Sequence, residues 1–135
     1  MDVKQLANQL NAWVDATSIK ITQNRYLAHG EADPLQKDSL LAEAIALERI
    51  SEEIQACVRV YATLRRLRPA IQANLQWIEQ ERDRWLEAYQ NEMYADKHAV
   101  GAEGYAQAYT HAAKTLRQIV GPPSQSFSSS KGSGC

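Results

Sequence analysis

Two stretches decide the fold of this chain: LERISEEIQACVRVYATL at residues 47–64 and IQANLQWIEQERDRWLEAY at residues 71–89. Alternating spacings of three and four residues separate their apolar side chains, which are Leu47, Ile50, Ile54, Cys57, Tyr61, Leu64, Ile71, Leu75, Ile78, Trp85 and Tyr89. This spacing is typical of the seam along which helices pack lengthwise on other helices. Arg68 and Arg82 occupy two positions of the same seam. The pattern predicts an all-α protein.

The seam keeps its phase across Pro69, which leaves two structures open. Proline suits the first turn of a helix but disfavours helical geometry at the residue before it. One structure is a kinked helix running from about Leu40 to Glu92, and the other is a corner at Pro69 between two helices. We favour the corner because it gives a compact, coiled-coil-like hairpin. Such a hairpin would bring Arg59 near Glu79, and the acidic pair Glu52 and Glu53 near Arg84.

Helix-start signals lie on the amino-terminal side of the seam. Asp2 precedes an apolar pattern that continues to about Arg25, and His29-Gly30 is expected to close that helix through a left-handed glycine. The stretch Asp33-Pro34-Leu35-Gln36 combines an N-cap, a proline at the first helical position and the glutamine of a capping box. A helix is therefore predicted to begin at Pro34 and to continue to about Leu67.

The carboxyl-terminal part carries two more helical patterns and a tail. One helix is predicted from about Pro69 to Lys97, and another from about Ala102 to Val120, separated by a turn at residues 99–101. The inner face of the last helix is expected to consist of Tyr105, Tyr109, Ala112, Leu116 and Ile119. The sequence thus predicts a bundle of about four helices over residues 1–123. Residues 124–135 are rich in serine and glycine and are predicted to be disordered.

Composition and charge set further limits. The chain has 135 residues, 44% of them hydrophobic, and a net charge of -1, so it offers no overall field that would attract nucleic acid or anionic lipid. Its apolar runs are far shorter than the roughly 20 residues that cross a bilayer, and its start does not resemble a secretory signal. We therefore expect no membrane association and a cytoplasmic location. Cys57 lies on the seam and Cys135 ends the tail, and no disulfide is expected between them.

No pattern of an enzyme or of a cofactor site is present in the sequence. His29, His98 and His111 lack the spacing of metal ligands, and no serine or cysteine lies on a predicted rigid turn beside a base. Residues 101–104 contain two glycines but no preceding strand and no phosphate-binding lysine. We predict a non-catalytic protein without a metal or a cofactor.

The leading hypothesis is a protein-interaction module, an adaptor, inhibitor or assembly subunit, that contacts another protein or a second copy of itself through its helix faces. The candidate contact residues are Trp77, Arg82, Trp85, Tyr89 and Met93. Aromatic residues and methionine are enriched in interfaces, although the same residues also fill cores. A polar residue such as Arg82 on an apolar seam often fixes register or partner. Self-association is expected along the stripe from Leu47 to Tyr89.

Two alternatives use other residues. Arg59, Arg65, Arg66 and Arg68 form the only concentrated basic group and suit phosphate contacts, which would indicate a nucleic-acid-binding or packaging accessory. The helix dipole offers a different reason for them, because cations are favoured in the last turns of a helix. A minor alternative is a small-ligand pocket between helices lined by Tyr105, Tyr109 and His111.

Overall fold

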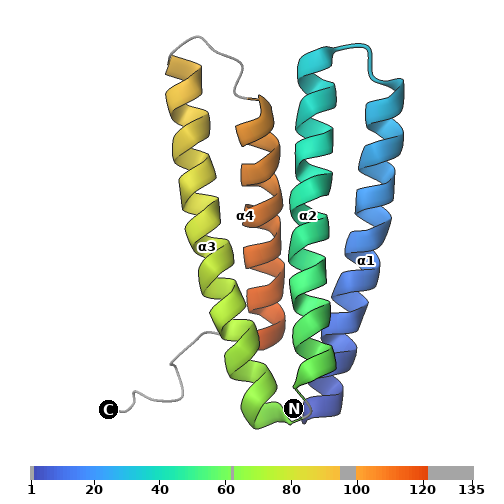
Figure 1. Cartoon of the computed structure of the whole chain (residues 1–135), viewed down its shortest axis with the longest axis vertical. Coiled ribbons are helices and arrows are strands. Elements are labelled where there is room, and N and C mark those ends of the chain that lie inside the picture. Colours follow the sequence, from blue (N-terminus) through green and yellow to red (C-terminus); the bar gives the residue numbers. More distant parts are fainter. Residues whose placement is uncertain (1, 62, 95–99, 122–135) are drawn as a thin grey trace.

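The computed structural model is an antiparallel bundle of four helices (Figure 1): α1 (Val3–Gly30), α2 (Pro34–Val60), α3 (Leu64–Tyr94) and α4 (Val100–Val120). The structure describes residues 2–61, 63–94 and 100–121, and for residues 92–94, 100 and 101 it describes the backbone alone. The predicted bundle of about four helices is confirmed. The sequence's predictions for residues 124–135 and for Cys135 lie outside the described residues.

Both predicted helix starts are confirmed, after Asp2 and after Asp33, but the two helices are capped differently. Asp2 accepts a hydrogen bond from the Gln5 amide while the Gln5 side chain accepts one from the Asp2 amide, which completes a capping box. Asp33 caps α2 through the Leu35 amide, with Pro34 in the first turn, rather than through a box with Gln36. Gly30 remains helical and Glu31 follows in an extended conformation, so the expected left-handed glycine at the end of α1 is wrong.

Helix α2 ends at Val60 and α3 begins at Leu64, so the chain reverses earlier than the predicted corner at Pro69. The carbonyl of Thr63 accepts hydrogen bonds from the amides of Arg66 and Leu67, which starts α3 there. Pro69 lies in the second turn of α3 and does not end the helix. Both the continuous rod and the corner at Pro69 are therefore wrong, because the helix boundary falls between Arg59 and Arg65 rather than at Pro69.

The predicted pairing of α2 with α3 is also wrong. The seam residues Leu47, Ile50, Ile54, Ile71, Leu75 and Ile78 are buried as predicted, but they meet in a common core instead of along a two-helix seam. Helix α2 packs mainly on α1 and α4, and α3 packs mainly on α4. Glu79 accordingly pairs with Arg117 of α4 at 2.5 Å, and Arg84 pairs with Glu81 of its own helix. The predicted pairs of Arg59 with Glu79 and of Arg84 with Glu52 or Glu53 are replaced.

Helices α2 and α4 run in the same direction and lie close together at the centre of the bundle (Figure 1). Small buried side chains line their contact, and a Cβ atom added at Gly104 would lie only 2.2 Å from the Ser39 carbonyl oxygen. In an ordinary up-and-down bundle these two helices would be diagonal neighbours. Their close approach flattens the bundle, so α1 and α3 become its outer helices.

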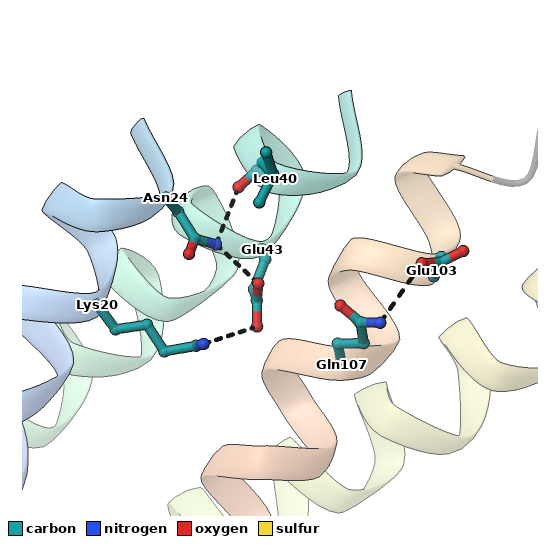
Figure 2. A network of polar contacts seen from close by, with 6 residues as sticks. All are labelled: Lys20, Asn24, Leu40, Glu43, Glu103 and Gln107. Atoms are coloured by element: carbon teal, nitrogen blue, oxygen red, sulfur yellow. Dashed lines mark hydrogen bonds and ion pairs between the residues drawn. The ribbon is translucent and has the colours of Figure 1, made fainter. Parts of the chain in front are cut away.

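Polar contacts join the helices at two places in the core. Asn24 of α1 donates hydrogen bonds to Glu43 Oε1 at 2.7 Å and to the Leu40 carbonyl at 3.3 Å, and Lys20 Nζ lies 3.8 Å from Glu43 Oε2 (Figure 2). Trp13 donates its indole hydrogen to Thr115 of α4 at 2.7 Å. Buried polar groups cost free energy unless they are paired, so these contacts fix α1 against α2 and α4.

Candidate functional site

The predicted contact residues of α3 fall into two groups, one packed inside the chain and one facing a surface groove. Trp77 belongs to the first group. It is half-buried, meets Tyr109 of α4 edge to face at 5.7 Å between ring centroids, and lies beneath the Arg49 guanidinium of α2 at 4.9 Å. Trp77 therefore connects α2, α3 and α4, and its ring makes contacts within the chain to both Tyr109 and Arg49.

Trp85 is in the same situation one layer further along α3. Its ring stacks on Tyr105 of α4, with 4.5 Å between centroids and 27° between planes, and the Arg84 guanidinium lies 5.1 Å from it. Tyr105 and Tyr109 thus face the aromatic side chains of α3, rather than lining a ligand pocket with His111. These aromatic contacts hold α3 and α4 at a fixed separation and so position the groove on their outer side.

A shallow groove of about 430 Å³ runs between the outer sides of α3 and α4. Its lining from α3 is Leu86 and Tyr89, and its lining from α4 is Glu103, Ala106, Gln107, Thr110, His111 and Lys114. A second hollow of about 330 Å³ continues it along the same helices past Arg82 and Arg117, sharing Thr110 and Lys114 with the first. We call the two hollows together the α3–α4 groove.

The register of the groove follows from the pairing of Glu79 with Arg117. Because α3 and α4 are antiparallel, this pairing places Arg82 near Lys114 and Leu86 near Thr110. Leu86 is 39% exposed there, at a position where its neighbours across the groove are polar. The middle of the groove therefore offers an uncovered apolar surface between polar walls.

Charge is distributed unevenly along the groove. Lys114 and Arg82 lie toward one end, where the nearby cation Arg117 is already neutralised by Glu79. Glu103 lies toward the other end and accepts a hydrogen bond from Gln107 at 3.4 Å, a contact within α4 that Figure 2 shows. Arg82 also contacts Asp83 at 3.0 Å, but that carboxylate is largely exposed and its attraction is screened by water. One half of the groove is thus basic.

Sequence reasoning found part of this site. Arg82 and Tyr89 were candidates and lie along the groove, as does His111 from the minor ligand hypothesis. Met93 falls within α3, but its side chain is outside the described residues. Leu86 and the α4 wall of the groove could not be distinguished in the sequence alone. The α4 wall could have been suspected, because the polar residues Glu103, Gln107, Thr110 and Lys114 are spaced as one face of a helix. The sequence does not indicate which other helix that face lies beside.

The arginine group lies at the end of the bundle where α2 meets α3. Arg59, Arg65 and Arg66 are exposed around the turn at residues 61–63, whereas Arg68 donates a hydrogen bond to the carbonyl of Val120 at the end of α4. Arg65 and Arg66 occupy the first turn of α3, the positive end of the helix dipole, instead of the last turn of α2. The dipole therefore does not account for them.

Other chemically active side chains are few in the described part of the chain. Burial raises the pKa of the Cys57 thiol, a hydrogen bond from Asn74 at 2.9 Å lowers it in part, and the nearby Glu53 charge raises it further. Burial likewise raises the pKa of the Tyr109 hydroxyl. Both groups are thereby kept neutral at pH 7. Among the residues described, no three His, Cys, Asp or Glu side chains gather as metal ligands.

The fold and its groove define the class of the protein as a four-helix bundle with an exposed interhelical groove. Comparison with protein-family models, with characterised proteins and with solved structures finds no match to this chain. None of the helices, within the residues described, has the length and apolar character needed to cross a bilayer.

Proposed function

We propose that this chain is a non-catalytic protein-interaction module whose α3–α4 groove binds an amphipathic helix carrying acidic residues on a partner protein. The observation that carries the proposal is the uncovered Leu86, flanked by Tyr89 and Ala106, in the middle of a groove with one basic half. Apolar surface left open beside polar walls is typical of helix-in-groove recognition.

The dimensions of the groove suit such an occupant. Glu103 and Gln118 mark its ends on α4, a separation of about 23 Å at 1.5 Å rise per residue. A partner helix of about four turns covers that length. Its apolar side chains would lie on Leu86 and Tyr89, and its carboxylates would face Lys114 and Arg82. Charge complementarity of this kind sets orientation and partner choice more than raw affinity.

A synthetic peptide pair tests the proposal. The probe is a fluorescently labelled helical peptide of about 15 residues with a leucine face and glutamate flanks, and its control replaces every glutamate with lysine. Fluorescence anisotropy should show at least tenfold tighter binding of the acidic peptide. Leu86→Glu and Lys114→Glu should each weaken that binding at least tenfold, and Lys114→Glu should strengthen binding of the lysine peptide.

Gln76→Glu is the matched control, because Gln76 is exposed on α3 and lines neither hollow of the groove. It should leave both peptides unaffected, and circular dichroism should show unchanged helicity in all variants. Equal binding of the two peptides, or equal effects of Leu86→Glu and Gln76→Glu, would refute the proposal.

A second candidate function is nucleic-acid binding through the exposed arginines Arg59, Arg65 and Arg66. It is supported by their position around one turn, where the positive end of the α3 dipole reinforces Arg65 and Arg66, although Arg59 lies in the last turn of α2. Binding of a labelled DNA duplex should then fall steeply between 50 and 200 mM salt and be lost in the Arg65→Glu/Arg66→Glu double variant. Weak binding that is insensitive to salt and unchanged in that variant would remove this candidate.

A further inference from the structure

One exposed stripe of α1, bordered by Asp15 on one side and Lys20 on the other, carries no charge over nearly its whole length. This surface, which we call the α1 face, consists of side chains that are all exposed: Gln5, Asn8, Gln9, Ala12, Ala16, Ile19, Gln23, Tyr26, Leu27 and Gly30. At 100° per residue these positions fall within one sector of about 100°, on the side of α1 away from the core. The charged residues of α1 lie on either side of this sector.

Three large apolar side chains are exposed on the α1 face. Ile19 is 61% exposed, Tyr26 79% and Leu27 55%. Leu27 and Tyr26 also border a hollow of about 490 Å³ that continues over the start of α2 to Leu40. Tyr26 and Leu27 are neighbours, and Ile19 lies two turns earlier on the same face. Exposed apolar side chains gathered on one helix face are typical of a surface that is covered in an assembly.

We infer that the α1 face binds a second copy of this chain, with the two α1 helices antiparallel across a twofold axis. In a twofold contact each surface patch meets its own copy, so a charged stripe would oppose itself close to the axis. An uncharged stripe avoids that repulsion. A different protein would ordinarily be selected through complementary charges, which the α1 face lacks.

The spacing along the face supports this pairing. Ala12, Ala16, Ile19, Gln23, Tyr26 and Gly30 alternate at four and three residues, as on a coiled-coil face. An antiparallel register centred between Ile19 and Gln23 places Tyr26 on Ala16 of the second copy. The same register places Gly30 beside Ala12 of the second copy, so large side chains meet small ones or flexible glutamines. Self-association thus uses α1 instead of the Leu47 to Tyr89 stripe, whose residues Leu47, Ile50, Ile54, Ile71, Leu75 and Ile78 are buried within the single chain.

The area of the contact predicts how stable the dimer is. The paired segment from Ala12 to Gly30 is about 27 Å long, and a helix is about 12 Å wide, so each chain buries roughly 300 Å². Specific, stable interfaces bury about 800 Å² per partner. The dimer is therefore expected to be reversible and dependent on concentration, and insensitive to salt because no ion pair holds it.

Sedimentation equilibrium of the full chain from about 10 µM to 1 mM tests the inference at 0.05 and 0.5 M salt. The wild-type protein should approach twice the mass of one chain as concentration rises, equally at both salts. Ala16→Lys and Tyr26→Glu should each weaken dimerisation at least tenfold, because either buries a charge opposite an uncharged residue of the second copy that cannot pair with it. Ser18→Lys is the matched control, exposed on α1 outside the face, and should dimerise as the wild type does.

Mixing variants tests the register. Ala16→Lys mixed with Tyr26→Glu should restore the dimer, because the register places these two residues opposite each other, whereas Ala16→Lys mixed with Ala16→Glu should not. A wild-type chain that stays monomeric at 1 mM would overturn the inference, as would an Ala16→Lys variant that dimerises normally. Restoration in the second mixture alone would overturn the antiparallel register.

Discussion

Replacing Gly104 with alanine should destabilise the bundle, although alanine is the better helix former. An added Cβ would lie 2.2 Å from the Ser39 carbonyl oxygen, 2.9 Å from the Ala42 Cβ and 3.0 Å from the Glu43 nitrogen. Two of these three atoms belong to the α2 backbone, which cannot turn away as a flexible side chain does. The Gly104→Ala variant must therefore push α4 away from α2 by about 1 Å to reach an ordinary contact distance.

The loss of unfolding free energy follows from the packed atoms of α2 and α4 that this displacement separates. A gap of 0.5–1 Å forfeits a quarter to a half of the dispersion energy between packed atoms, and inserting a methyl group into a filled core costs about 1–3 kcal/mol. The gain in helix propensity from glycine to alanine returns about 1 kcal/mol. The strain falls on a backbone contact, so we place the cost at the upper end, and the expected net loss of unfolding free energy is about 1–2 kcal/mol.

Urea denaturation followed by circular dichroism measures this loss as a lower midpoint at unchanged slope. Gly30→Ala is the matched control, because a Cβ at Gly30 meets nothing within 4 Å and the residue is helical. It should leave the midpoint unchanged or raise it slightly. A Gly104→Ala protein as stable as the wild type would refute the close contact of α2 and α4.

Three further predictions concern other contacts. Asn24→Ala should lower the unfolding free energy in urea by about 1–3 kcal/mol, because it leaves the Glu43 carboxylate without its buried donor. The folded chain raises the pKa of the Cys57 thiol, so this thiol stabilises the fold below its ordinary pKa of 9.0 and loses that contribution as pH rises further. Urea midpoints should therefore fall between pH 8 and 10, and the Cys57→Ala variant should show a smaller fall. Arg68→Ala should speed amide hydrogen exchange in the last turn of α4, and the exposed Arg65→Ala should not.

The sequence was sufficient to predict the helical class and most of the core. The three- and four-residue spacing from Leu47 to Ile78 identifies the buried face of a helix whichever helices pack against that face. The prediction of the buried aliphatic residues was therefore correct even though the predicted neighbouring helix was wrong. Capping at Asp2 depends on residues only three positions apart, so it was predictable as well. These features are local, and local chemistry decides them.

The position of the turn and the choice of helix pairs were not predictable in the same way. Pro69 is tolerated in the second turn of α3, and the residues at 61–63 carry no glycine or proline to mark the reversal. The spacing of the apolar residues does not indicate which helix packs against them. Gly104 looked like part of an incomplete phosphate loop, and its role became visible only when Ser39 was placed against it.

Some residues of the candidate site could be predicted from the sequence and others could not. Tyr89 and Arg82 stood out because aromatic and cationic residues interrupt an otherwise aliphatic stripe. Leu86 did not, because an exposed leucine cannot be distinguished from a buried one until both groove walls are known. Trp77 was a candidate contact residue for another protein, and within the chain it contacts Tyr109 and Arg49.

Backbone amide NMR of the labelled chain, titrated with the acidic helical peptide, shows directly which helices bind the peptide. The account predicts saturable shifts at the amides of Leu86, Tyr89, Thr110 and Lys114, which line the groove. The amides of Ile19 and Tyr26 on the α1 face should not move in a sample dilute enough to be monomeric. Shifts confined to α1 or to the turn at residues 61–63, or no saturable shifts at all, would contradict the assignment of partner binding to the α3–α4 groove.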